Sequence, residues 1–242
     1  MNNLGMDSAR TNLANLKWQR CLLGPLGHQL VKRANVPLEC KKRRINCLEF
    51  DMVTNMAPEL DASWNRYGLI AEIIERFESA KQRLGKTALQ KMVFLLQRSF
   101  GVDCDYSYTL YTYGPYSADV SRDLDIVEGL DGAHVNYDLK FAGYEIHPGS
   151  KSADLRGRAS GFLEEISPML DQLISDFGSF GAKDLELRST ALFLAKPGVN
   201  RAKLVQQVHE VKPHFSEAQI ETAITELEKK SYIGGTAFMA AN

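Results

Sequence analysis

Apolar and polar residues follow a helical spacing over most of the chain. In seven segments the apolar residues recur every three or four positions, as in helices that bury one face. In the segment at 87–100 this spacing places Lys86, Lys91 and Arg98 on the outer surface. The expected buried face of that segment is Leu89, Met92, Val93, Leu96 and Phe100. The predicted helices lie at about 61–81, 87–100, 118–130, 155–177, 183–194, 201–211 and 216–230.

One short segment has the spacing of a strand. Residues 106–113 read Tyr-Ser-Tyr-Thr-Leu-Tyr-Thr-Tyr, and aromatic and β-branched side chains at period two favour an extended chain. Gly114 and Pro115 are expected to end this strand. A hairpin is predicted around a turn at 142–143. Its expected strands are 135–139 and 144–147.

Residues that favour helix ends support these boundaries. Thr87, with Gln90 three residues later, has the spacing of a capping box. Gly101 suits the left-handed conformation that commonly follows a helix. The other expected N-caps are Ser117, Asn200 and Ser216.

These elements predict a mostly helical α+β protein with two modules. The order helix, helix, strand, helix, hairpin is that of a winged helix, and we place this module at 61–178. Residues 179–234 are expected to form a small three-helix unit like a helix-turn-helix, with a last short strand at 232–233. The remaining segments are a basic, poorly ordered leader at 1–60 and a tail at 235–242. The pattern leaves open whether the two modules fold separately.

Composition is that of a soluble globular protein. The 242 residues are 44% hydrophobic and 24% charged. No apolar run approaches the roughly 18 residues of a membrane span, and charged residues interrupt any signal-peptide pattern. We therefore expect a cytoplasmic protein that does not associate with membranes.

Charge is distributed unevenly along the chain. Residues 1–55 contain nine lysines and arginines and four acids, a net charge of +5, whereas the remainder has 20 basic and 26 acidic residues, a net charge of −6. The run Lys41, Lys42, Arg43, Arg44 is compatible with a nucleic-acid-binding arm or with a solvated leader. The acidic remainder argues against a protein whose main task is to neutralise phosphates.

No pattern of catalytic or metal-binding residues is present. The sequence lacks the GxSxG, HExxH, P-loop and GxGxxG patterns. The four cysteines form no CxxC pair and are expected to be free thiols, although Cys40 and Cys47 with His28 leave an irregular metal site open. We therefore expect no enzyme activity, no cofactor and no metal.

Two segments carry a resemblance to a known family. The run Lys86-Thr87-Ala88-Leu89-Gln90-Lys91 and the later Tyr113-Gly114-Pro115-Tyr116-Ser117 resemble the SocA-like, or Panacea, antitoxin family, with the closest similarity to its YwgA-like branch. The resemblance covers roughly residues 66–148, and residues 183–233 look similar to the helical C-terminal region of that branch. It implies a non-enzymatic module that neutralises a toxin or acts as an adaptor. It implies no catalytic residues.

The corner after the aromatic strand is the expected partner-binding surface. Tyrosines beside a turn are typical of binding hot spots, and neighbouring acids would attract a cationic protein partner, a toxin or other client. The predicted contact residues are Leu110, Tyr113, Gly114, Pro115, Tyr116, Asp119 and Asp123.

DNA binding by a transcriptional regulator is the alternative hypothesis. The basic leader and the first two helices would contact DNA, and a dimer would form. The helix at 118–130 argues against this hypothesis, because its net charge of −3 suits a phosphate-lined groove poorly. The candidate nucleic-acid contacts are Lys41, Lys42, Arg43, Arg44, Lys86 and Lys91. The sequence leaves the oligomeric state open.

Overall fold

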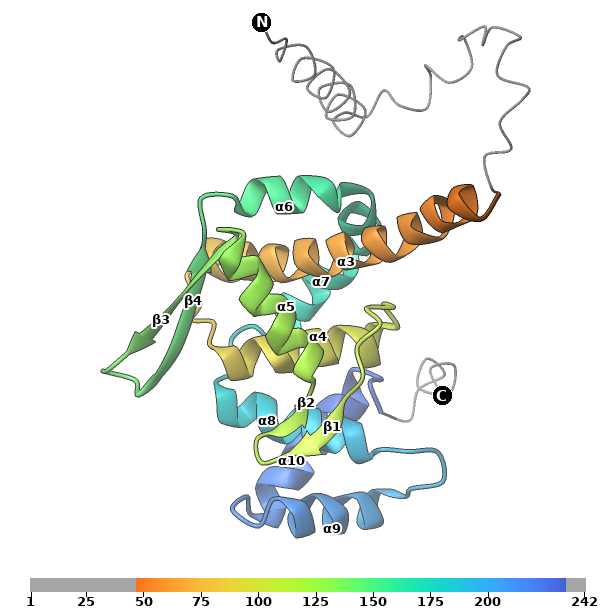
Figure 1. Ribbon diagram of the computed structural model, residues 1–242. Helices are drawn as coiled ribbons and strands as arrows, with labels where there is room; N and C mark the ends of the chain where they lie inside the picture. The colour runs from red at the N-terminus through yellow and green to blue at the C-terminus, as the bar shows by residue number, and fades with distance from the viewer. Residues whose placement is uncertain (1–46, 234–242) are drawn as a thin grey trace, which may run out of the picture. The chain divides into compact units, whose positions relative to one another are not determined.

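The computed structural model describes residues 47–233, with side chains from Ala62 onward. The chain divides into two units, Met1–Val53 and Thr54–Asn242, and the elements discussed below belong to the second unit apart from the start of the first helix. In the described residues there are eight helices and two antiparallel strand pairs, which confirms the mostly helical α+β class (Figure 1).

The elements follow one another as helices with two inserted hairpins. The helices are α3 (Cys47–Ser79), α4 (Lys86–Phe100), α5 (Ala118–Gly129), α6 (Ser152–Arg158), α7 (Ser160–Phe177), α8 (Ala182–Leu194), α9 (Arg201–Val211) and α10 (Glu217–Lys229). The strands are β1 (Thr109–Tyr111), β2 (Gly114–Tyr116), β3 (Ala133–Asp138) and β4 (Gly143–Pro148).

Helix α4 lies at the centre of the core. It contacts α5, α7, α8, β2 and β4, and its residues from Ala88 to Leu96 are all buried. The buried Gln90 amide donates to Ser117 O at 2.8 Å and to Ser121 Oγ at 2.9 Å, and its oxygen accepts from Ser117 N. The predicted capping box is therefore wrong: α4 begins after Gly85, and Gln90 binds the start of α5 instead of Thr87.

Helix α8 joins the C-terminal helices to the same core. It contacts α4, β2, α9 and α10 (Figure 1), and every residue from Leu185 to Leu192 is buried. The Arg188 guanidinium lies 3.8 Å above the Phe180 ring and donates to Glu226 of α10 at 3.1 Å. The hydrophobic core runs without interruption from α3 to α10.

Several predicted boundaries and caps are confirmed. Helix α9 spans the predicted residues, and Asn200 accepts from Lys203 N at 2.9 Å as its cap. Ser216 forms a complete capping box with Gln219, and Ser117 caps α5. Gly101 has the expected left-handed φ of 68°. The β3–β4 hairpin forms at the predicted place.

Other expectations differ from the structure. Helix α3 begins at Cys47, inside the predicted leader, because helix formers such as Glu, Leu and Met need no apolar stripe to favour a helix. The single helix expected at 155–177 is divided at Ala159 into α6 and α7. Residues 232–233 are not a strand. Residues 1–46 and the tail at 235–242 lie outside the described residues.

A close approach accompanies the division of that helix. A side-chain carbon at Gly68 of α3 would lie 2.3 Å from the Cβ of Ala159. Glycine at this position therefore lets α3 pack directly against the corner between α6 and α7. None of the described helices has both the length and the apolar composition required to cross a membrane.

Asp123 is buried, although the sequence suggested an exposed acid. Its Oδ2 lies 3.0 Å from Arg66 Nε of α3 and accepts from the Tyr106 hydroxyl at 2.9 Å. Burial and the neighbouring carboxylate raise the pKa of Tyr106 well above its ordinary value. Asp119, one turn earlier, is partly exposed and pairs with Arg122 at 2.8 Å.

The two aspartates predict contrasting losses of stability. Asp123→Ala should lower the free energy of unfolding by about 2–3 kcal/mol, because it leaves Arg66 and Tyr106 without their buried partner. Asp119→Ala, the matched control, should cost less than about 1 kcal/mol. Urea unfolding at neutral pH measures both, and equal losses would contradict the buried network.

Candidate functional site

The Gly-Pro-Tyr segment is a strand and not the end of one. Tyr111 pairs with Gly114 and Thr109 with Tyr116, so β1 and β2 form a hairpin whose loop is the two residues 112–113. The predicted strand at 106–113 is thus reduced to three residues, and the chain reverses direction at 112–113, so that Gly114 begins the second strand.

Glycine is required at position 114 for two reasons. Its φ of 88° lies in the left-handed region that other residues rarely adopt. An added Cβ would also lie 3.0 Å from Thr190 Oγ1 and 3.4 Å from both Glu186 O and Lys91 Cε. The hairpin therefore rests directly on α8 and on the Lys91 side chain.

Two buried ammonium groups hold the hairpin through its main chain. Lys91 of α4 is 2% exposed, and its Nζ donates to Pro115 O at 2.6 Å. Lys212, which follows α9, donates to the carbonyls of Tyr111, at 3.4 Å, and Thr112. The prediction that Lys91 lies on the outer surface is wrong, because the hairpin and α8 cover that side of α4.

One buried carboxylate balances these cations. Glu186 Oε1 of α8 lies 2.7 Å from Lys212 Nζ and 3.7 Å from His214 Nε2. Burial lowers the pKa of Lys91 to about 8, an effect that Glu186 opposes and Lys212 reinforces. Within residues 62–233, no three His, Cys, Asp or Glu side chains are arranged to hold a metal.

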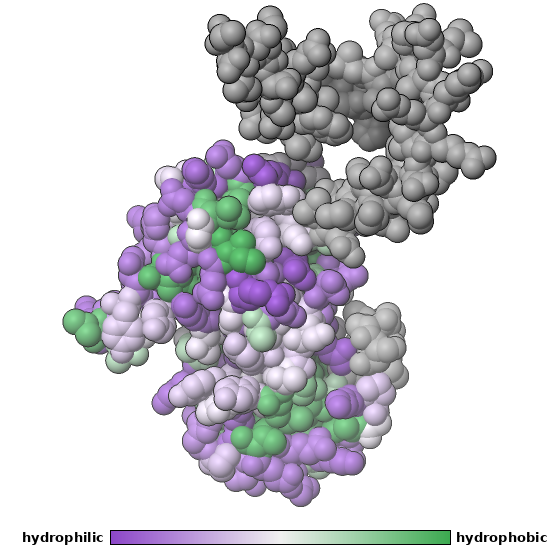
Figure 2. All heavy atoms as spheres, in the orientation of Figure 1, coloured by the Kyte–Doolittle hydropathy of each residue, from purple (hydrophilic) through white to green (hydrophobic). Residues whose placement is uncertain are grey.

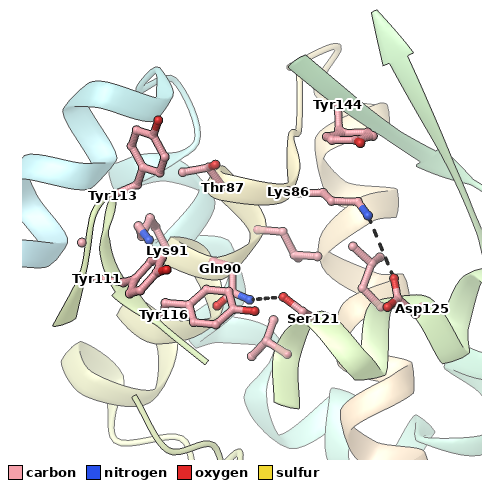
Figure 3. Close-up of a pocket in the computed structure, with 14 residues that line it drawn as sticks. Lys86, Thr87, Gln90, Lys91, Tyr111, Tyr113, Tyr116, Ser121, Asp125 and Tyr144 are labelled. Atoms are coloured by element: carbon pink, nitrogen blue, oxygen red, sulfur yellow. Dashed lines mark hydrogen bonds and ion pairs between the residues drawn. The ribbon is translucent and has the colours of Figure 1, made fainter. Parts of the chain in front are cut away.

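A cleft of about 360 Å³ opens between this hairpin, α4, α5 and β4. Its floor is apolar and consists of Leu89, Val120 and Leu124. Tyrosines surround the floor: Tyr111 and Tyr116 lie together on one side and Tyr144 on the other, with Tyr113 nearby (Figure 3). The exposed fractions of Tyr111, Tyr113, Tyr144 and Tyr116 are 68%, 63%, 49% and 37%.

A few polar groups reach the cleft. Lys86 Nζ lies 4.0 Å from Asp125 Oδ1 and 4.8 Å from the centre of the Tyr144 ring. The bond from Gln90 to Ser121 crosses the floor (Figure 3). The cleft can thus cover an apolar side chain and offer hydrogen bonds and a cation at its rim.

The structure brings together only part of the predicted binding set. Tyr113, Gly114 and Tyr116 line the cleft, whereas Leu110 and Pro115 do not. Of the acids, Asp119 lies outside the cleft and Asp123 is buried beneath the surface, so the expectation that Asp123 contacts a partner is wrong.

The candidate nucleic-acid contacts are also separated. Lys86 lines the cleft and Lys91 is buried below the hairpin, which makes Lys91 unavailable to a nucleic acid. Lys41, Lys42, Arg43 and Arg44 lie outside the described residues. The sequence interpretation missed Tyr144, whose only signal was a tyrosine after a hairpin glycine. Asp125 belongs to the neighbouring acids expected at the binding surface, although it was not among the predicted contact residues, and it lines the cleft.

The two segments that carry the family resemblance contact each other. Gln90 binds Ser117 and Lys91 binds Pro115, so the Leu-Gln-Lys and Tyr-Gly-Pro-Tyr-Ser segments form one structural unit. No protein-family model matches the chain, and neither does any curated protein. The resemblance therefore rests on these residues.

Gly114→Ala should destabilise the protein. A residue with a β-carbon loses about 1–2 kcal/mol of stability in the left-handed conformation, and the close contact with Thr190 adds to this loss. Gly161→Ala on α7 is the control, because nothing lies within 4 Å of its added carbon. Urea unfolding should show a loss of about 1–3 kcal/mol for the first variant only. An unchanged Gly114→Ala protein would contradict the described packing.

The depressed pKa of Lys91 predicts a pH-dependent stability. Its folded value of about 8 lies below the ordinary 10.5, so the folded chain binds fewer protons between these limits and gains stability as pH rises through them. From about pH 7 to about pH 9.5, wild type should gain on the order of 2 kcal/mol relative to Lys91→Met.

Urea titrations of both proteins at the two pH values measure this difference. The buried tyrosines do not obscure it, because their pKa values are raised above 10 and they are common to both proteins. If the stability difference between the two proteins stays constant with pH, the pKa of Lys91 is not lowered in the folded protein.

Proposed function

We propose that this protein is a non-enzymatic, antitoxin-like regulator that acts by binding another protein at the tyrosine-lined cleft. The observation that carries this proposal is the combination of an apolar floor with four exposed tyrosine rings. Tyrosines around an apolar depression are the usual composition of a protein-binding hot spot.

The rigid support of the cleft favours binding. Tyr111, Tyr113 and Tyr116 sit on a hairpin whose carbonyls are bound by Lys91 and Lys212. A surface that is already ordered loses little conformational entropy when a partner docks. The buried charged groups are engaged with the hairpin and with each other, which supports a structural role for them.

The mechanism would be steric. An apolar side chain of the partner would occupy the floor formed by Leu89, Val120 and Leu124, and the tyrosines would exclude water around it. Coverage of a toxin surface or recruitment of a client would follow from such docking, as the SocA-like resemblance implies.

We also propose a winged-helix-like relation among α3, α4, β1, α5 and the β3–β4 hairpin. In this arrangement α5 would be the recognition helix and the hairpin the wing. The surface of α5 carries Asp119, Asp125 and Glu128. The wing exposes Leu139 and Phe141 in the loop at its tip, and Figure 2 shows apolar surface there. Acidic and apolar groups at these places support a protein partner over DNA.

Tyr116→Ala should weaken partner binding by about 1–3 kcal/mol. Tagged full-length protein would be recovered from its native host after nuclease treatment, and bound proteins would be quantified by mass spectrometry. The purified partner would then be titrated by calorimetry. Lys203→Ala is the control, because this side chain is exposed on α9 and lies outside both the cleft and the wing.

Loss of a stoichiometric partner in Tyr116→Ala but not in Lys203→Ala supports the proposal. Equal retention by both variants would remove the cleft from the binding site. Recovery of nucleic acid alone, only when nuclease is omitted, would overturn protein binding as the main function.

A further inference from the structure

The tyrosine-lined cleft is one part of a longer groove. Two further cavities, of about 390 and about 700 Å³, adjoin it. Thr87 lines the cleft and both further cavities. The cavity of about 390 Å³ also shares Lys86 and Tyr144 with the cleft, and the cavity of about 700 Å³ shares Tyr111 and Tyr113 with it. The groove thus passes around the start of α4, with the two hairpins and the start of α8 as its walls.

The charge of this groove is opposite to that of the body of the chain. Residues 56–242 have a net charge of −6, yet five cations and two carboxylates line the groove. The cations are Arg83, Lys86, Lys91, Lys183 and Lys212, and the acids are Asp125 and Glu186. Glu186 is already paired with Lys212 at 2.7 Å.

Three of the cations lie near the surface. Lys183 is exposed and has no ion-pair partner among residues 62–233. Lys86 is 4.0 Å from its acid, and Arg83 is 3.8 Å from Glu145 while it stacks on Phe141 at 4.3 Å. These separations are long for ion pairs, so the cations retain capacity for another carboxylate.

The backbone at the same place has the matching polarity. Helices α4 and α8 begin at Gly85 and Gly181, neither of which provides a side-chain cap, and both glycines line the groove. Helix α4 has no acid in its first turn, whereas α8 carries Asp184 there, so it is the start of α4 that remains open to a further negative charge. Unsatisfied N–H groups at a helix start favour negative charge, which adds to the effect of the lysines.

We infer that the groove accepts a peptide segment of the partner in which an apolar side chain is flanked by aspartate or glutamate. The apolar side chain would cover Leu89 and Leu124, and the carboxylates would lie beside Lys86 and Lys183. This inference rests on the proposed function and specifies its partner. It reverses the cationic partner expected from the sequence, since Asp123 is buried and Asp119 is paired with Arg122.

The inference is tested by peptide selection on the intact protein. A phage library of random dodecapeptides would be selected on the full chain, and a fluorescein-labelled peptide of the resulting consensus would be titrated by fluorescence anisotropy. We expect a consensus with an apolar residue between acids. The double variant Lys86→Glu, Lys183→Glu should raise the Kd of the labelled consensus peptide at least about tenfold. Lys203→Glu on α9, the control, should leave this Kd unchanged.

Salt provides a second measurement. Raising ionic strength from about 50 to about 300 mM should weaken the wild-type complex more than that of the double variant. Thermal unfolding would verify that the variants fold, which we expect because an acid at the start of α4 suits the helix dipole.

Neutral or basic selected peptides, failure to select any peptide, or a Kd unaffected by the double substitution would overturn the inference. Its failure is distinguishable from that of the proposed function. A captured partner that depends on Tyr116 but not on Lys86 and Lys183 would refute the acidic peptide alone, whereas a partner independent of Tyr116 would refute both.

Discussion

The attachment of the β1–β2 hairpin by buried lysines is the interaction on which the rest of the site depends. Three residues in each strand give too few contacts for an isolated hairpin to be stable. Lys91 and Lys212 supply donors to its carbonyls from below, and Glu186 offsets part of the cost of burying two cations. Because these groups come from α4, α8 and the end of α9, the hairpin has its position only when all three helices are packed together.

The same attachment links stability to recognition. The lysines fix the strands that carry Tyr111 and Tyr116, and the ring centres of these tyrosines are 5.9 Å apart. Buried charge below the hairpin also contributes to the positive character of the groove. Replacement of a lysine would therefore change both the position of the tyrosines and the local field, so binding data for such variants would mix the two effects. Exposed residues such as Tyr116 and Lys183 separate them.

Sequence periodicity predicted the helices that bury one face. It failed for the helices that other elements cover on several sides. Helix α9 and its cap were predictable because its apolar stripe and polar face are distinct. In α4 and α8 the polar residues Gln90, Lys91 and Glu186 are buried. A prediction that allows each helix a single buried face of apolar residues places these polar residues on the solvent-exposed surface. Asp123 did carry a signal, since with Val120, Leu124 and Val127 it falls on the buried face of α5. The partners that explain these residues are distant in sequence, so spacing alone could not identify them.

The difference in charge between groove and body determines how an acidic partner would be recognised. The net charge of −6 in residues 56–242 repels an acidic molecule at long range, but at an ionic strength of 0.1 M this repulsion is screened beyond about 10 Å. Attraction by Lys86 and Lys183 acts only when carboxylates come close to the groove. An acidic segment without a fitting apolar side chain would gain little, because exposed ion pairs are worth at most about 1 kcal/mol each. Selectivity would then come from the apolar floor and the tyrosines, with charge deciding which fitting segments are accepted.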